Sequence, residues 1–446
     1  MIFVSTGGGA PETGLREALF RGLAPDGGLY VPARLPRFSR GQLRAMEASD
    51  WPEAAVAVAQ RLLADALDPA VVRRLVRDAL DFPVPLRPLT DRIQVLELFH
   101  GPTLAFKDVG ARFMARLMAH FRGDDPEPLT VLTATSGDTG GAVARAFLGL
   151  PGIRVVVLFP DGKVTPRQER QFSTLGRNVR AVAVQGDFDD CQRMAKAAFR
   201  DRELRKRVAL TSANSINVGR LIPQTFYYFL AWARLARARP AGTAGGGETP
   251  ILFTVPSGNF GNLAAGLMAG AMGLPGARFL AATNANDEVP EYLETGRFRP
   301  RPSVRTLSTA MDVGDPSNLA RILHLYGHDL DRLRRDLDAR VVSDQETRDC
   351  IRRVHARRGY VLDPHSAVGY RALEKELEEG GGAGGDGAVG VLLATAHPAK
   401  FAEVVEPVLG EPLPLPPELA ECLERERVVS PMEPDSGALK EYLLGE

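Results

Sequence analysis

Short apolar runs rich in β-branched residues alternate with stretches of helical periodicity along most of the chain. The apolar runs predict strands at residues 93–98, 129–133, 153–159, 179–184, 251–255, 278–283 and 389–395. The periodic stretches between them predict helices near 110–121, 140–149, 188–206, 219–238 and 262–272. Strands that alternate with helices are typical of a doubly wound parallel α/β sheet, which we expect to be split into two domains.

The first 85 residues have a different pattern, with apolar residues at helical spacing over 11–20 and 42–80. Three closely spaced prolines, Pro83, Pro85 and Pro88, then mark a boundary. We therefore expect a mainly helical N-terminal domain at 1–85 and an α/β region at 86–446. The α/β region divides into subdomains at roughly 86–230 and 231–446. Glycine-rich stretches at 241–247 and 380–387 are predicted to be surface loops.

Composition narrows the function classes. The 446 residues are 44% hydrophobic and carry 55 basic and 55 acidic side chains, so the net charge is +0. A neutral chain has no bulk attraction to nucleic acid or to an anionic membrane. No apolar run approaches the ~20 residues of a membrane span, and the N-terminus lacks the pattern of a signal peptide. We therefore expect a cytoplasmic enzyme with no nucleic-acid or membrane partner.

The cysteines and histidines do not indicate a metal site. The three cysteines are widely spaced and odd in number, which argues against a disulfide framework and against a cysteine-based zinc site. His324 and His328 have helical spacing, but Gly327 interrupts the turn and no third ligand is close in sequence.

Lysine is rare in this chain, and its scarcity singles out Lys107. Of the 55 basic residues only seven are lysine. Arginine cannot be deprotonated in a protein, so it cannot serve as an amine nucleophile. Lys107 follows an apolar Leu-Ala-Phe run and precedes a predicted helix, which Asp108 is expected to cap. Burial among apolar groups would lower the pKa of this lysine and give an amine able to form a Schiff base.

Two glycine-rich loops, 135–141 and 256–262, each follow a predicted strand and precede a predicted helix. Such a loop presents unpaired N–H groups at the positive end of the helix dipole, which favours an anion. No Gly-Lys-Ser/Thr follows either loop, so nucleoside triphosphates are disfavoured. The G-x-G-x-x-G pattern at 382–387 precedes a strand instead of following one, so it is interpreted as a linker.

An activated lysine and two anion-binding loops fit pyridoxal 5′-phosphate, with its phosphate in one loop and an amino-acid carboxylate in the other. These features indicate amino-acid chemistry, but they do not select the reaction.

Seven motifs, in this order along the chain, carry a family resemblance. They are Gly22-Leu-Ala-Pro-Asp-Gly-Gly-Leu-Tyr-Val-Pro32, His100-Gly-Pro-Thr-Leu-Ala-Phe-Lys-Asp108, Thr135-Ser-Gly-Asp-Thr-Gly140, Asn214-Ser-Ile-Asn-Val-Gly-Arg220, Pro256-Ser-Gly-Asn-Phe-Gly-Asn262, Asp363-Pro-His-Ser-Ala-Val-Gly369 and Thr395-Ala-His-Pro-Ala-Lys-Phe401. With them the chain resembles, nearly end to end, the threonine synthase family of fold-type II (tryptophan synthase β-like) pyridoxal-phosphate enzymes. The resemblance implies that residues 86–446 form the catalytic region.

The resemblance also implies residue roles. Lys107 would hold the cofactor as a Schiff base, and Thr395 would hydrogen-bond the pyridine nitrogen. The cofactor phosphate would lie in the loop formed by Ser257, Gly258, Asn259, Phe260, Gly261 and Asn262. The substrate would contact Thr103, Ser136, Gly137, Asp138, Thr139, Asn214 and Arg220. No metal is implied.

The implied reaction converts O-phospho-L-homoserine and water into L-threonine and phosphate by γ-elimination and β-addition. A dehydratase, a sulfhydrylase or a phospho-lyase that gives a 2-oxo acid are alternatives within the fold, and a non-catalytic cofactor-binding protein is an alternative outside it. The chain is expected to be a monomer or a homodimer.

Two finer expectations concern single residues. The substrate phosphate is a third anion and needs its own cation. Lys163, just past the strand 153–159, is the first candidate, and Arg167 and Arg220 compete with it. At Gly261 we expect a Cβ to crowd the backbone that must approach the phosphate or to block a positive φ, so that Gly261→Val would weaken cofactor retention.

Overall fold

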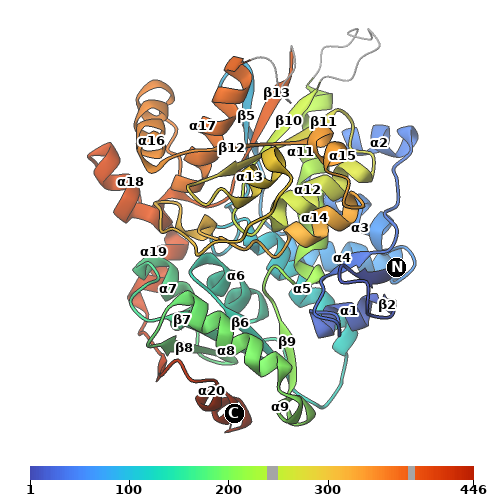
Figure 1. Ribbon diagram of the computed structural model, residues 1–446, viewed down its shortest axis with the longest axis vertical. Helices are drawn as coiled ribbons and strands as arrows, with labels where there is room; N and C mark the ends of the chain where they lie inside the picture. The colour runs from blue at the N-terminus through green and yellow to red at the C-terminus, as the bar shows by residue number, and fades with distance from the viewer. Residues whose placement is uncertain (239–249, 380–386, 446) are drawn as a thin grey trace.

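The structure is a computed structural model that describes residues 1–238, 250–379 and 387–445. Two sheets of mainly parallel strands form its upper and lower parts in Figure 1, and the N-terminal segment lies beside them. The predicted loop 241–247 lies outside the described residues, as does 380–387 apart from Gly387. Across these described ranges, no helix is long and apolar enough to cross a membrane.

The upper sheet has six strands in the order β12-β11-β10-β13-β5-β4, and only β4 is antiparallel to its neighbour. The strands are β4 (Leu86–Pro88), β5 (Ile93–Glu97), β10 (Ile251–Pro256), β11 (Ala277–Thr283), β12 (Leu337–Val341) and β13 (Val389–Ala394). The helical elements of this part are α12 (Gly261–Ala271), α13 (Glu288–Thr295), η2 (Thr309–Met311), α14 (Leu319–Leu325), α15 (Leu330–Asp336), α16 (Asp344–Arg358), α17 (Pro364–Glu379), η3 (Pro398–Phe401) and α18 (Ala402–Leu409). Every residue of β10 is buried, as expected for a central parallel strand covered on both faces.

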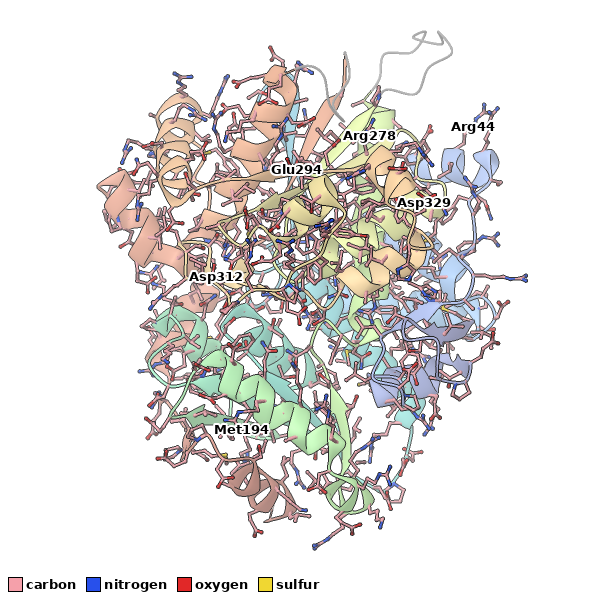
Figure 2. The ribbon with its side chains drawn as sticks, in the orientation of Figure 1. Arg44, Met194, Arg278, Glu294, Asp312 and Asp329 are labelled. Atoms are coloured by element: carbon pink, nitrogen blue, oxygen red, sulfur yellow. The ribbon has the colours of Figure 1, made fainter. Side chains whose placement is uncertain are left out.

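The lower sheet has five parallel strands in the order β14-β8-β7-β6-β9. They are β6 (Leu129–Ala134), β7 (Ile153–Pro160), β8 (Val179–Val184), β9 (Ala209–Ser212) and β14 (Ser430–Met432). Its helices are α6 (Asp138–Phe147), α7 (Pro166–Ser173), α8 (Phe188–Arg200), α9 (Arg202–Arg207), α19 (Pro417–Glu424) and α20 (Ser436–Gly445). Met194 of α8, labelled in Figure 2, shares an apolar cluster with Leu439 of α20, so the end of the chain covers the outer face of this sheet.

The N-terminal segment combines a small antiparallel sheet, in the order β2-β1-β3, with four helices. Its elements are β1 (Ile2–Ser5), β2 (Thr13–Gly14), β3 (Tyr30–Pro32), α1 (Leu15–Arg21), α2 (Arg40–Glu47), α3 (Glu53–Leu63) and α4 (Pro69–Ala79). The helices agree with the periodicity, whereas the sheet was not predicted because its strands are only two to four residues long.

Four helical elements lie between these parts: α5 (Lys107–Arg122), α10 (Val218–Leu221), η1 (Ile222–Thr225) and α11 (Phe226–Arg237). Their buried side chains join those of the N-terminal helices and of one face of each sheet in a single apolar core. Smaller clusters cover the outer face of the upper sheet and the outer face of the lower sheet. Each sheet therefore has helices on both faces, and the predicted doubly wound α/β architecture is confirmed.

All seven predicted strands are present, but sheet membership differs from the predicted subdomains at two points. The strand β5 precedes residue 230 yet pairs with β13 in the upper sheet, and β14 lies near the end of the chain yet pairs with β8 in the lower sheet. The division at 230/231 is therefore wrong for these two strands. Apolar periodicity predicts that a segment is a strand, but it carries no information on which strand becomes its neighbour.

Two predicted helices are interrupted for local reasons. The predicted helix at 188–206 is two helices, because the Asp201 carboxylate accepts hydrogen bonds from the Glu203 and Leu204 N–H groups and starts α9. The predicted helix at 219–238 contains the 3₁₀ turn η1, where Pro223 lacks the N–H that a continuous helix would need.

Asn217 joins the N-terminal segment to the lower sheet and is fully buried. Its Nδ2 donates to the carbonyl oxygens of Leu19 (2.8 Å) and Ser212 (2.9 Å), and its Oδ1 accepts from the Gly219 N–H (2.9 Å). Asn217→Ala removes three hydrogen bonds from buried groups, and of these groups the Leu19 carbonyl keeps another donor, the Thr211 hydroxyl at 3.5 Å. We therefore expect it to lower the free energy of unfolding by roughly 2–4 kcal/mol. Ser39→Ala, at the exposed capping box of α2, should cost only about 1 kcal/mol. Urea unfolding followed by circular dichroism compares the two variants, and equal losses would contradict this role of Asn217.

Candidate active site

Both glycine-rich loops begin where the strand order of a sheet reverses. In the upper sheet β11 and β12 lie on one side of β10, and β13 and β5 lie on the other. In the lower sheet β7 and β8 lie on one side of β6, and β9 lies on the other. The loop after β10 and the loop after β6 thus start at switch points, outside the carboxyl ends of parallel strands. This is the position at which open α/β sheets bind ligands.

The carboxyl edges of the two sheets meet at these loops. Asn259, after β10, donates from Nδ2 to the Oγ of Ser215 (2.7 Å), which follows β9. Gln171 of α7 donates from Nε2 to the carbonyl oxygen of Thr103 (3.1 Å), which follows β5. Segments from both sheets therefore line one site.

The loop 257–262 has the features of an anion site. Among the described residues, none accepts a hydrogen bond from the N–H groups of 258–262, which lead into the first turn of α12. The buried Asn262 accepts at Oδ1 from the hydroxyls of Tyr227 (2.6 Å) and Tyr228 (2.8 Å), and its Nδ2 is left without a partner. Backbone and side-chain donors thus remain available for an anion at the positive end of this helix.

In this loop an added Cβ would clash at Gly258 but not at Gly261. A Cβ on Gly258 would lie 2.6 Å from the Cα of Met311, whereas the nearest atom to a Cβ on Gly261 is the Asn318 Nδ2 at 3.4 Å. The positive φ belongs to Phe260, at 57°. The expectation that Gly261 supplies conformational freedom is therefore wrong. The segment against Gly258 is held by Asp312, labelled in Figure 2, which accepts from the Thr306 N–H (3.0 Å) and the Asn284 Nδ2 (2.9 Å).

The loop 135–141 also has the features of an anion site. Thr135 Oγ1 accepts from the N–H groups of Gly137 (3.0 Å) and Gly140 (2.9 Å), which fixes the turn. Gly137 has a φ of 155°, and a Cβ there would meet the Gln168 amide at 2.8 Å. The N–H groups of Ser136, Asp138 and Thr139 have no acceptor in the described part of the chain. They are available to a carboxylate at the N-terminus of α6.

Lys107 opens α5 directly behind the loop 98–106. The prediction that Asp108 caps this helix is wrong, because Phe106 occupies the N-cap without a side-chain bond. Asp108 accepts instead from the N–H (2.9 Å) and the Oγ1 (2.7 Å) of Thr103, and so fixes the loop that precedes Lys107. Burial raises the pKa of Asp108, and these hydrogen bonds oppose the rise.

The surroundings of Lys107 lower the pKa of its amine. Burial, followed by the charges of Arg220 and Lys400, lowers the pKa of Lys107 to about 8, against the opposing charge of Asp138. Burial would raise the pKa of Asp138, but the ammonium groups of Lys400 and Lys107 hold it well below its usual range. Burial also lowers the pKa of Arg220 to about 10, against the charge of Asp108. Lys107 therefore has an amine that is partly unprotonated near neutral pH.

Several predicted residues have internal partners that shape the loops. Ser257 Oγ donates to the Val255 carbonyl (2.8 Å), and Asn214 Nδ2 donates to the Ala134 carbonyl (2.8 Å). Asn259 Oδ1 accepts from the Ser317 N–H (2.6 Å). Thr395 differs, because its hydroxyl has no hydrogen-bond partner in the described ranges, while its carbonyl accepts from the Phe106 N–H (2.8 Å). The Thr395 hydroxyl is thus free to bind a ligand.

The three candidates for the substrate phosphate differ in their surroundings. Lys163 is exposed and makes no ion pair within the described residues. Arg167 donates from Nη1 to the Ala399 carbonyl (2.6 Å) and approaches Glu406 at 3.6 Å. Arg220 is buried, donates from Nη1 to the Ala213 carbonyl (2.7 Å), and keeps an Nε without a partner.

Sequence reasoning missed Lys400 as a site residue. Its side chain is fully buried, and its Nζ lies 2.7 Å from Asp138 Oδ1. The scarcity of lysine could have drawn attention to it, since it is one of seven and lies just past the last predicted strand.

Known proteins share this architecture over the whole chain. A family model described as pyridoxal-phosphate dependent enzyme matches residues 84–395. Models described as threonine synthase N terminus and threonine synthase, C-terminal match residues 2–80 and 366–443. The threonine synthase of Serratia marcescens is 43% identical over 434 residues, which is 97% of each chain.

Two solved structures are also close. The crystal structure of threonine synthase from Escherichia coli has a TM-score of 0.90 and 42% identity, and covers 100% of both chains. The structure of PLP-bound threonine synthase from Brucella melitensis has a TM-score of 0.89 and 37% identity, and covers 100% of this chain and 99% of that one.

The fold and the site define a pyridoxal-phosphate dependent enzyme of fold type II, a lyase whose cofactor is pyridoxal 5′-phosphate. Within this class, the chain belongs to the threonine synthase family. Its own residues fit the cofactor: a helix N-terminus with free N–H groups and the unpartnered Asn262 Nδ2 suit the phosphate, and Lys107 supplies an amine of lowered pKa.

The geometry of the loop 257–262 predicts different effects at its two glycines. Gly258→Ala forces the backbone at Met311 to move, at a cost of about 1–3 kcal/mol. We therefore expect this variant to lose cofactor on dialysis, with an affinity weaker by on the order of tenfold or more. Gly261→Ala is the matched control and should retain cofactor like the unchanged protein. The measurement is the absorbance of bound cofactor after dialysis, and equal retention in both variants would contradict the steric argument.

Proposed function

We propose that this enzyme converts O-phospho-L-homoserine and water into L-threonine and phosphate, in the cytoplasm, as a monomer or a homodimer. Membership of the threonine synthase family supports this reaction over the others of the fold, and the geometry that supports it is two helix N-termini whose N–H groups have no acceptor among the described residues, together with an amine of lowered pKa. An amino acid on the cofactor brings a phosphate, a carboxylate and an α-proton to one place. These three groups match the two N-termini and the amine.

Lys107 is the residue that bonds covalently to the aldehyde carbon of the cofactor. When bound, the cofactor supplies an electron sink for a carbanion at the substrate Cα. With its Nζ free, the Lys107 amine would be able to accept the substrate α-proton and later return it. Its pKa of about 8 suits both directions of transfer near neutral pH.

The two loops divide the anions between them. We assign the cofactor phosphate to the N–H groups of 258–262 together with the Asn262 amide, and the pyridine nitrogen to the Thr395 hydroxyl. We assign the substrate carboxylate to the N–H groups of Ser136, Asp138 and Thr139. The Asp138 side chain is itself an anion, so it contributes through its N–H and not through its carboxylate.

The remaining predicted contacts support these groups. Thr103 and Asn214 hold the loops in place, and Gly137 allows the sharp turn before α6. The substrate phosphate requires a cation, and Lys163, Arg167 and Arg220 are the candidates. Arg220 is supported by its burial, its free Nε and its electrostatic coupling to Lys107.

The proposed reaction is tested by its products. The purified enzyme, loaded with pyridoxal phosphate, is incubated with O-phospho-L-homoserine, and amino acids, 2-oxo acids and phosphate are measured together. We expect threonine and phosphate in equal amounts. Phosphate accompanied by 2-oxobutyrate would instead support a phospho-lyase, and release of no phosphate would refute the proposed substrate.

The role of Lys107 is tested by covalent labelling. Borohydride reduction of the loaded enzyme followed by peptide mapping should place the pyridoxyl group on Lys107. A label on Lys163 or Lys400 would overturn the assignment. Lys107→Arg keeps a cation but cannot bond to the aldehyde, so turnover should fall by orders of magnitude.

A further inference from the structure

Lys400 is a fully buried lysine that connects segments from both sheets. It lies in η3, beyond the carboxyl end of β13 in the upper sheet. Its Nζ donates to the Thr103 carbonyl at 2.6 Å and lies 2.7 Å from Asp138 Oδ1. Thr103 precedes Lys107 in the loop after β5, and Asp138 opens α6 in the lower sheet. One ammonium group therefore touches the loop 98–106 and the loop 135–141.

The two partners of Lys400, Thr103 and Asp138, each accept a further hydrogen bond. Gln171 Nε2 donates to the same Thr103 carbonyl (3.1 Å), and Gln168 Nε2 donates to the same Asp138 oxygen (2.8 Å). Both glutamines belong to α7, in the lower part. The Lys400 position is fixed in turn because η3 is capped by the His397 side chain, which accepts from the Ala399 N–H. The ion pair is thus held in one arrangement on every side.

The charges around Lys107 come from four elements. Asp138 on α6, Arg220 on α10 and Lys400 on η3 all act on Lys107, and its sequence neighbour Asp108 on α5 interacts with Lys400 and Arg220. The two other cations and the two carboxylates balance in charge. A protonated Lys107 would add an uncompensated charge to this buried cluster, which is costly in a region of low dielectric.

We propose that Lys400 is a positioning residue, which holds the Asp138 carboxylate in its own ion pair and so keeps Lys107 without a dedicated counter-ion. The inference rests on the proposed role of Lys107, and it adds a reason why that amine is free. Without Lys400, Asp138 would be left as a buried carboxylate whose nearest cation is Lys107. The two would then pair, and the Lys107 amine would be held in its protonated form.

The proposal predicts that the pKa of Lys107 shifts in opposite directions in two variants. Lys400→Met removes a like charge and frees Asp138, so the pKa of Lys107 should rise from about 8 by about one unit or more. Asp138→Asn removes a carboxylate that acts directly on Lys107, so that pKa should fall. The pKa of Lys107 in the double variant should lie between its values in the two single variants. A residue that only supports the fold would move both single variants in the same direction.

The test uses cofactor-free full-length protein. Trace acetic anhydride modifies only unprotonated amines, and peptide mass spectrometry reports the Lys107 modification at each pH. Lys375→Met is the matched control. Lys375 lies on α17, away from these loops, and its Nζ is 2.5 Å from Oε1 of Glu346 on α16. Circular dichroism checks that each variant is folded, and Lys400→Gln, which also removes the charge, takes the place of Lys400→Met if that variant does not fold.

We expect the modification of Lys107 to reach half its maximum near pH 8 in the unchanged protein and in Lys375→Met. This midpoint should be higher in Lys400→Met and lower in Asp138→Asn. Equal midpoints in Lys400→Met and Lys375→Met would overturn the proposal, as would a rise in Asp138→Asn. The labelling reports the Lys107 amine whichever lysine bonds to the cofactor. A failure of the positioning role is therefore distinguishable from a failure of the borohydride assignment.

Discussion

The ion pair between Lys400 Nζ and Asp138 Oδ1, at 2.7 Å in a fully buried setting, is the contact on which the site depends. A buried charge is tolerated only when it is paired and hydrogen-bonded, so each partner fixes the position of the other. Because Lys400 extends from the upper sheet and Asp138 from the lower one, the same contact fixes the distance between their carboxyl edges. It also brings Lys107 into a cluster whose charges already balance without it.

Both sheets have the same local arrangement at the site. Each places a glycine-rich turn and a helix N-terminus at the strand where its order reverses, and each leaves backbone N–H groups without acceptors. One N-terminus faces a site that suits the cofactor phosphate, and the other suits a carboxylate. Lys107, to which we assign the reaction, begins a third helix. Binding and chemistry are therefore supplied mainly by backbone geometry, and side chains such as Asn259 and Asp108 hold the loops in place.

The sequence allowed much of this arrangement to be predicted, for identifiable reasons. Lys107 stands out because lysine is rare and an apolar run precedes it, and the loops stand out because glycine separates a strand from a helix. The pairing of β5 with β13 and the contact of Lys400 with Asp138 join residues that are far apart in sequence, and no local pattern encodes them. The capping role given to Asp108 was wrong because its carboxylate binds the preceding loop instead.

The central claim, that Lys107 is a neutral amine at a pH where ordinary lysines are charged, can be measured directly. With only seven lysines, cofactor-free protein labelled with ¹³C at lysine Cε gives a spectrum simple enough to follow through a pH titration. The account predicts that one signal titrates with a midpoint near 8 and that this signal is absent in Lys107→Arg. Ordinary lysine titrates at about 10.4. A Lys107 signal that titrates with the ordinary lysines, near pH 10 or above, would contradict the account.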